Sequence, residues 1–145
     1  MGPLNFPDYS FRLSRVDARE FIYDPIRKKE VVLTPEEWVR QHVIAFFCET
    51  QNYPISLIAV EREIKFNQLK KRFDVLLFNK KGEPEMLVEC KAPEVKLSSE
   101  TLFQIATYNM VFKVPFLFVS NGLSHLLFQL NEEGIYISTA EFPII

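Results

Sequence analysis

Three ionisable side chains interrupt two strongly apolar stretches in the middle of the chain. Asp74 lies in the stretch at 72–78, and Glu89 and Lys91 lie in the stretch at 85–91. A short polar turn separates the two stretches, so together they predict a β-hairpin. Charged side chains in such apolar strands indicate either a structural ion pair or a catalytic or metal-binding site.

The register of this hairpin is expected to bring the two carboxylates together. Closure of the turn places Asp74 opposite Glu89 and Arg72 opposite Lys91, all on one face because side chains alternate with period two. In a direct cross-strand pair the Cβ atoms lie about 4.5–5.5 Å apart. Two negative charges at that separation are destabilising unless a proton or a cation is shared between them.

Two kinds of cation fit this position. Lys91 is two residues past Glu89 on the same strand face, so its ammonium can reach the pair. A divalent ion such as Mg²⁺ suits carboxylate oxygens, lowers the pKa of its bound water and stabilises charge developing on a phosphate. The residues alone therefore leave two alternatives: a metal site in which Lys91 serves the attacking water, and a structural ion pair without chemistry.

The opposite face of the hairpin is expected to be apolar. The register starts from Phe78 opposite Glu85, and Leu76 then faces Leu87. Strands that are apolar on both faces are central strands with helices above and below. The apolar set on the opposite face comprises Phe73, Val75, Leu77, Met86, Val88 and Cys90.

The rest of the chain predicts the elements that hold this hairpin. Thr34 as N-cap and Pro35 at the first helical position open a helix, and Glu37 completes a capping box. Ser98 and Ser99 open a second helix. The order β, α, βββ, α, ββ predicts an α/β fold with a mixed central sheet, two flanking helices and a helical crossover between parallel strands. Strands are expected at 21–33 (two, with a break), 55–66, 72–78, 85–91, 114–120, 123–130 and 134–138.

Size and composition limit the classes of function. The chain has 145 residues, 48% of them hydrophobic, which fits a single domain at 1–145 with an extended N-terminal arm at 1–19. The net charge of −2 requires that any contact with nucleic acid comes from a local patch or from another subunit. The best local patch comprises Lys65, Lys70, Lys71 and Arg72.

The cellular location is predicted from the lack of a signal peptide, the lack of a membrane span and the setting of the two cysteines. The chain start lacks the apolar segment of a signal peptide, and no run approaches the length of a membrane span. Cys48 and Cys90 lie in apolar stretches, which is typical of free thiols in a reducing compartment. A cytoplasmic protein without a membrane partner is therefore expected.

The series of an Asp, a β-hairpin and Glu-x-Lys resembles the PD-(D/E)xK nuclease signature. It stands here as Asp74 followed by Glu89, Cys90 and Lys91. The chain more closely resembles the N-terminal nuclease domain of type I restriction enzyme R subunits, over about residues 21–128. The stretches that carry this resemblance are TPEEWVRQHV, AVEREI, KRFDVLLF, LVECKAP, QIATYN and PFLFVSNG.

This resemblance implies a restriction-endonuclease-like core and hydrolysis of phosphodiester bonds in DNA with Mg²⁺ or Mn²⁺. It implies that Asp74 and Glu89 bind the metal, that the backbone carbonyl of Cys90 joins them, and that Lys91 positions the nucleophile. Glu61 matches an acidic position upstream of the family's Asp. It is a further candidate ligand, with a solvated strand end as the alternative.

Two residues of the second predicted helix extend the resemblance. Gln104 and Tyr108 match the family's Q-x-x-x-Y element, and their i, i+4 spacing puts both on one helix face. The resemblance implies that they contact the DNA backbone or Lys91. A polar helix edge with a half-buried tyrosine is the alternative interpretation.

Three features depart from the family. Phe73 replaces the Pro of the signature, the Walker A motif of the ATP-driven motor is absent, and the chain is mildly acidic. The function implied is a Mg²⁺-dependent DNA endonuclease domain. The alternative is a non-catalytic module of the same fold that binds nucleic acid or protein. The expected partners are DNA and either a second copy of the chain or a separate motor or specificity subunit.

Overall fold

The computed structural model describes residues 1–143, which form a six-stranded sheet, a three-stranded sheet and two main helices. No helix in this part of the chain is both long and apolar enough to span a bilayer. The helices are α1 (Pro35–Ala45) and α2 (Ser99–Met110), with short helical turns at Phe46–Thr50 and Ile55–Leu57. The strands are β1 (Leu13–Val16), β2 (Arg19–Asp24), β3 (Lys29–Val32), β4 (Ile58–Phe66), β5 (Leu69–Phe78), β6 (Pro84–Cys90), β7 (Phe116–Ser120), β8 (His125–Leu130) and β9 (Tyr136–Thr139).

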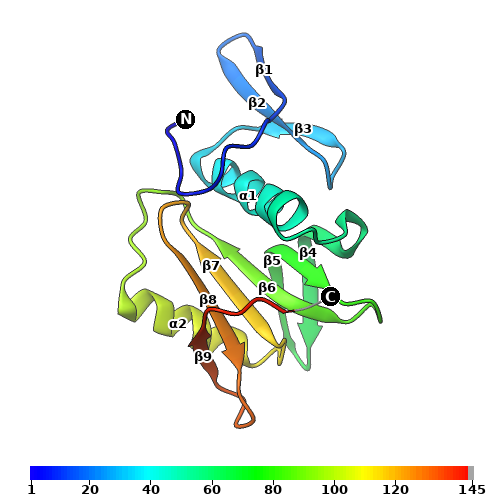
Figure 1. Cartoon of the computed structure of the whole chain (residues 1–145), viewed down its shortest axis with the longest axis vertical. Helices are drawn as coiled ribbons and strands as arrows, with labels where there is room; N and C mark the ends of the chain where they lie inside the picture. The colour runs from blue at the N-terminus through cyan, green and yellow to red at the C-terminus, as the bar shows by residue number, and fades with distance from the viewer. Residues whose placement is uncertain (144–145) are drawn as a thin grey trace.

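The large sheet contains its strands in chain order, from β4 to β9 (Figure 1). Only β6 and β7 pair in parallel, and the other neighbours within this sheet are antiparallel. Because parallel neighbours need a crossover connection, the chain passes from β6 to β7 through α2. The predicted α/β class, the mixed sheet and the helical crossover are therefore confirmed.

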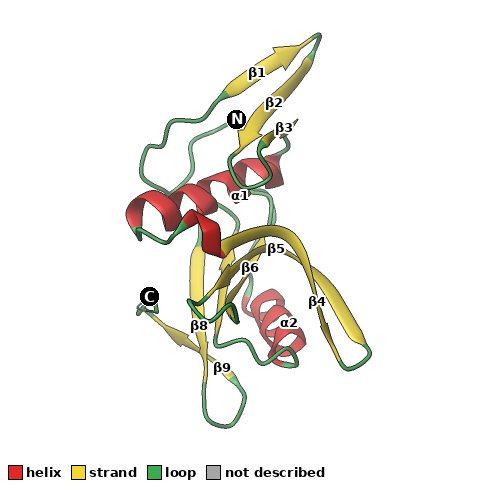
Figure 2. Ribbon diagram, turned by 90° about the vertical axis from the view of Figure 1, so that its right-hand side faces the viewer, coloured by secondary structure: helices red, strands yellow, loops and turns green. Residues whose placement is uncertain are grey.

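Each face of the large sheet buries one hydrophobic cluster. On the first face, Val39 and Val43 of α1 pack in a cluster with Val75 of β5. On the second face, Ile105 of α2 packs against a cluster that contains Leu76. Figure 2 shows the two helices on opposite sides of the sheet. The prediction that β5 and β6 are central strands, covered on both faces, is confirmed.

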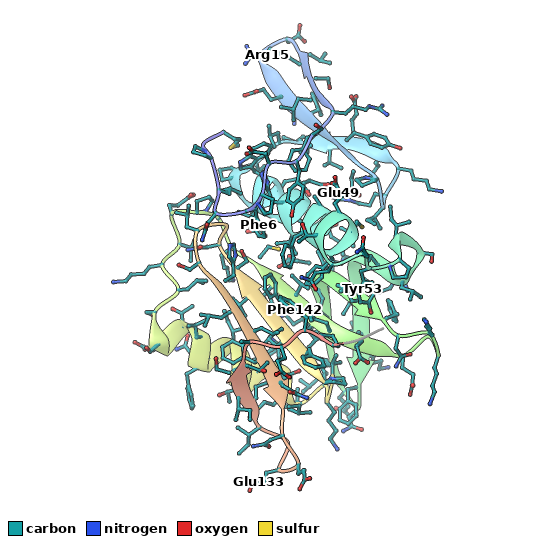
Figure 3. All side chains as sticks on the ribbon, in the orientation of Figure 1. Phe6, Arg15, Glu49, Tyr53, Glu133 and Phe142 are labelled. Atoms are coloured by element: carbon teal, nitrogen blue, oxygen red, sulfur yellow. The ribbon has the colours of Figure 1, made fainter. Side chains whose placement is uncertain are left out.

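The first three strands form a separate sheet in the order β1-β2-β3, beyond α1 from the large sheet (Figure 1). Residues 1–12 contain no helix or strand, whereas Leu13–Val16 pair with β2, so the arm predicted at 1–19 is shorter than expected. Figure 3 shows Arg15 at the far end of the β1–β2 hairpin, away from the large sheet. Earlier in the arm, Phe6 packs on His42 and Phe46, which anchors the arm to α1.

Both main helices begin at the predicted residues. Thr34 Oγ1 accepts a hydrogen bond from the backbone N–H of Glu37 at 3.0 Å, and Ser98 caps α2 in the same way. The other half of the predicted capping box, a bond from the Glu37 side chain back to the Thr34 amide, is wrong. The carboxylate of Glu37 accepts a hydrogen bond from Arg27 at 2.8 Å instead of returning to the Thr34 amide, because a charge-assisted bond is the stronger one.

The β5–β6 hairpin keeps the predicted register in its middle. The pairs there are Val75 with Val88, Leu76 with Leu87 and Leu77 with Met86. Three predictions at the ends of the hairpin are wrong. The ladder begins at Val75 with Val88, so the direct cross-strand pair of Asp74 with Glu89 is not part of it. Phe78 pairs with Pro84 rather than Glu85, because an irregularity next to the turn shifts the ladder. In addition, β6 ends at Cys90, so Lys91 lies outside the strand.

Side-chain alternation slips along β5 near Asp74. Leu76 faces α2, so a strict period of two would put Phe73 on the α1 face. Phe73 instead packs in the α2 cluster, with its ring centroid 5.3 Å from that of Phe112. The slip coincides with a gap in the β4–β5 ladder, which omits Asp74 and the opposing Glu61. Glu61 has a φ of 53°, a left-handed conformation that is uncommon outside glycine. The face predicted for Phe73 is therefore wrong.

Candidate functional site

Asp74 sits where β5 leaves the regular ladder, and two hydrogen bonds hold it there. Its Oδ2 accepts a hydrogen bond from the backbone N–H of Cys90 at 2.7 Å. Its backbone carbonyl accepts one from Arg40 Nη1 at 3.4 Å, in the gap left because Glu61 does not pair opposite it. These contacts hold the Asp74 carboxylate against the end of β6, which carries Glu89.

The surroundings of Asp74 favour its protonated form. Burial raises the pKa of Asp74 from 3.8 to about 6, with further increases from the charges of Glu89 and Glu36 and with decreases from the Cys90 N–H and the Arg40 charge. Of these causes, only the negative charges of Glu89 and Glu36 would attract a cation, because burial disfavours a charge of either sign. Burial also raises the pKa of the Cys90 thiol well above its ordinary value, so this side chain is neutral and is not a thiolate ligand.

Glu89 is buried at the end of β6, and its partners come from β5 and α2. Lys71 Nζ donates a hydrogen bond to Glu89 Oε1. Asn109 Nδ2 donates to the same oxygen at 3.4 Å, and Lys71 Nζ also donates to Asn109 Oδ1 at 3.3 Å. The slip in β5 explains this arrangement: Lys71 shares a strand face with Phe73, so both turn toward α2 and Glu89.

Lys91 does not balance the carboxylates as the sequence predicted for an ion pair. Its backbone N–H donates to the Ser120 carbonyl at 2.9 Å as the chain leaves the sheet. Within residues 1–143 its side chain forms no ion pair, and Lys71 neutralises Glu89 instead. The predicted pairing of Arg72 with Lys91 is also wrong, because β6 has ended before that position.

Of the two predicted α2 residues, the structure brings only Tyr108 to this site. The Lys71 ammonium lies 5.0 Å from the centre of the Tyr108 ring and 4.9 Å from that of Phe73, which is within the range of cation–π attraction. Gln104 is exposed one turn earlier on α2. Among the described residues, its side chain makes no hydrogen bond.

Glu61 joins a network of charges on the α1 side of β5 rather than the Asp74–Glu89 pair. Its carboxylate lies 3.4 Å from Arg40 Nη1 and 3.8 Å from Arg27 Nη1. Arg40 Nε in turn lies 3.2 Å from Glu37 Oε2, a charge contact without hydrogen-bond geometry. The network continues from Arg27 to the fully buried Asp24 at 2.6 Å. It links the small sheet, α1 and β4 to the backbone of Asp74.

The donor groups present fit a hard divalent cation held by few protein ligands. Within residues 1–143, no three Asp, Glu, His or Cys side chains gather as a metal-binding cluster. Mg²⁺ does not require such a cluster, because it usually keeps several waters and takes only one or two carboxylates. Asp74 and Glu89 provide two, in surroundings that raise the pKa of Asp74. Zinc, which prefers four protein ligands including Cys or His in structural sites, does not fit.

Four residues that shape this site were not predicted from the sequence. Lys71 was predicted only as one member of a basic cluster, and Asn109 was given no role. Arg40 and Glu36 lie on α1 within the stretch TPEEWVRQHV, but neither was assigned a role there. The missed Asn109 left one signal, since an Asn on the inward face of an apolar helix must find a buried partner; it is fully buried here.

The comparisons with known proteins agree with the resemblance carried by the sequence motifs. The family model described as "Type I restriction enzyme R protein N terminus (HSDR_N)" matches residues 35–143. This range runs from the start of α1 past the end of β9 and includes Asp74, Glu89 and Lys71. No curated protein matches the chain. Because the match spans well over half of its length, the chain belongs to the family of type I restriction enzyme R protein N-terminal domains.

Proposed function

We propose that this chain is a Mg²⁺-dependent DNA endonuclease domain with a restriction-endonuclease-like core. The observation that carries the proposal is the place of the Asp74 carboxylate at the end of β6, where it accepts the N–H of Cys90, the residue after Glu89. Burial, and to a lesser extent the charge of Glu89, raise the pKa of Asp74 there to about 6. A fold gains nothing in stability from such a pair, so a bound cation explains it better than packing does. Membership of the restriction enzyme family supports DNA as the substrate.

Asp74 and Glu89 would hold the metal, with the backbone carbonyl of Cys90 as a third oxygen. The ion supplies a bound water of lowered pKa and a positive charge for the phosphate. Lys91 follows β6 directly and forms no ion pair within residues 1–143, so its ammonium is available to orient the attacking water. Glu61 serves in this proposal through Arg40, which it contacts, and so helps to position Asp74.

The DNA backbone would contact the part of the β4–β5 hairpin that extends beyond the end of β6. Exposed basic side chains gather there, and phosphate contacts of this kind do not depend on sequence. Tyr108 and Gln104 of α2 are also exposed, and the Tyr108 ring contacts the ammonium of Lys71 on β5. Since the net charge is −2, we propose that a second copy of the chain or a motor or specificity subunit adds to the DNA-binding surface. The basic side chains are Lys65, Lys70 and Arg72.

A non-catalytic module of the same fold is the second candidate. The contact between Lys71 and Glu89 favours it, because this ion pair neutralises one carboxylate without any metal. In that case the chain would bind nucleic acid or a protein partner and leave it intact.

Metal titration combined with DNA cleavage separates the two candidates. Wild type, Asp74→Asn and Lys91→Met are incubated with plasmid and single-stranded DNA in Mg²⁺ or Mn²⁺, and metal binding is measured by calorimetry. The nuclease proposal expects cleavage by wild type only, with metal binding lost in Asp74→Asn and kept in Lys91→Met. The exposed variant Glu94→Gln serves as the control and should match wild type. Equal weak metal binding by wild type and Asp74→Asn, with no cleavage in any condition, would support the module.

A further inference from the structure

Lys71 occupies an enclosed position that an ordinary surface lysine does not have. Its ammonium contacts groups from three elements: Glu89 of β6, Asn109 and the Tyr108 ring of α2, and the Phe73 ring of β5 itself. Only 25% of its side chain is exposed, against 10% for Glu89. The two rings and the amide restrict the ammonium to one place, directly on the carboxylate.

The adjacent lysine shows the contrast. Lys70 lies one residue earlier, its side chain is 65% exposed, and its nearest carboxylate is Glu63 at 4.0 Å, itself 48% exposed. That is a solvated ion pair of the kind that contributes little. The same hairpin therefore carries one lysine that water screens and one that is built into the site.

The position of Lys71 has a direct consequence for metal binding. Its hydrogen bond goes to Glu89 Oε1, and Glu89 is one of the two carboxylates that the proposed metal would use. Oε1 is thus occupied, whereas no hydrogen bond to Oε2 is seen among the described residues. A divalent ion on this carboxylate would lie close to the ammonium, and the two cations would repel each other. Ammonium and metal therefore compete at Glu89.

We propose that Lys71 is an internal counter-ion that competes with the divalent metal for Glu89 and leaves this carboxylate when the metal binds. Without metal it neutralises a buried charge, which keeps the site folded. With metal that task passes to the ion. This inference rests on the proposed metal site. It adds that Lys71, which lies outside the Glu-x-Lys motif, lowers the affinity of the site for the metal.

The first test compares metal affinity in matched variants. Mn²⁺ binding is measured by calorimetry for wild type, Lys71→Met, Lys71→Gln and Lys70→Met. Removal of the competitor should tighten binding about fivefold or more in both Lys71 variants, as expected when a charge-assisted hydrogen bond no longer has to be broken. Lys70→Met removes the same charge from the same hairpin and should change the affinity less than about twofold. Lys71→Gln keeps an amide donor for Glu89 and guards against loss of fold in Lys71→Met.

The second test follows Lys71 in the wild-type protein. Reductive methylation is carried out with and without saturating Mn²⁺, and modification is measured for each lysine by peptide mass spectrometry. We expect methylation of Lys71 to rise severalfold with Mn²⁺, because the ammonium has left its enclosure, while Lys70 changes little. This assay needs no variant and measures no cleavage.

The outcomes distinguish the inference from the function on which it rests. Binding of Mn²⁺ to wild type but not to Asp74→Asn would support the metal site. If the Lys71 variants then bind Mn²⁺ with wild-type affinity and Mn²⁺ does not change the methylation of Lys71, the competition is refuted while the metal site is supported. If Mn²⁺ binds neither wild type nor any variant, the proposed metal site itself fails. Tighter binding in the Lys71 variants together with metal-dependent methylation of Lys71 supports both.

Discussion

Replacing Asp74 by Asn should stabilise the metal-free protein at neutral pH. The charged form of Asp74 is disfavoured in the fold, since burial and then the neighbouring charge of Glu89 raise its pKa from 3.8 to about 6. Asn has nearly the same shape and keeps an oxygen that can accept the Cys90 N–H bond. One pH unit of pKa difference is worth about 1.36 kcal/mol, so relief of the charge is worth at most about 3 kcal/mol. Because water reaches part of the site and screens it, we expect about 1–2 kcal/mol.

The pH dependence of this effect has a definite sign. A carboxyl group with a raised pKa in the folded protein binds its proton more tightly there than in the unfolded chain. Its contribution to stability is therefore complete below about pH 4 and is lost as the pH rises through about 6. Wild type and Asp74→Asn should thus be nearly equal in stability at pH 4 and should diverge between pH 4 and 6, with the variant the more stable above pH 6.

Urea unfolding in EDTA, followed by far-UV circular dichroism at several pH values, measures this difference directly. Asp8→Asn is the control, because Asp8 is exposed and lies in the arm far from the site in sequence. Saturating Mn²⁺ should reverse the order, since only wild type gains free energy from binding. If Asp74→Asn is less stable than wild type in EDTA at pH 8, the argument that this carboxylate is kept for a cation is refuted.

Three further predictions test other parts of the structure. Arg40→Met should lower the free energy of unfolding by about 1–3 kcal/mol, because it removes a nearly buried guanidinium that contacts Glu37, Glu61 and the Asp74 carbonyl, although Arg27 still pairs with Glu37. Arg15→Met, at an exposed pair, should cost less than about 0.5 kcal/mol; urea unfolding measures both. Lys91→Met should leave the free energy of unfolding within about 0.5 kcal/mol of wild type, while the rate of cleavage in Mg²⁺ falls by a factor on the order of 10². A large loss of stability would show instead that Lys91 is the partner in a structural ion pair. Binding of the isolated chain to DNA, measured by fluorescence anisotropy, should be weak and fall steeply with salt, and tight binding that persists at high salt would contradict the role given to Lys70 and its basic neighbours.

Much of the fold could be predicted because its signals are local. The caps at Thr34 and Ser98 fix the starts of α1 and α2, and both are seen as hydrogen bonds. The apolar stretches around the turn fix the register of Leu76 with Leu87, because a slip of one residue would move every side chain to the other face. Each of these features is determined by residues close together in the sequence, so it can be predicted without the rest of the chain.

The partners within the site could not be predicted, because they depend on where the alternation breaks. A regular strand would have placed Arg72 on the face of Glu89, would have paired Asp74 directly with Glu89, and would have left Lys91 to balance the two carboxylates. The observed strand turns Lys71 to that face instead. The amino-acid sequence of β5 contains no signal for this interruption of side-chain alternation near Asp74. The visible sign of the interruption is the left-handed backbone of Glu61 on the neighbouring strand, a conformation that only the structure reveals.

That single irregularity accounts for three features of the site. Because Asp74 is unpaired with β4, its backbone carbonyl accepts a hydrogen bond from Arg40. The irregularity also accompanies the hydrogen bond from the Cys90 N–H to the Asp74 carboxylate, and it turns Lys71 toward Glu89. A non-glycine residue in the left-handed region costs free energy, and it persists only where the surroundings enforce it. Here the Glu61 carboxylate lies 3.4 Å from Arg40 Nη1, and the same nitrogen donates to the Asp74 carbonyl. The conflict between strand pattern and structure therefore falls at the residues to which we assign chemistry, where such conflicts are expected.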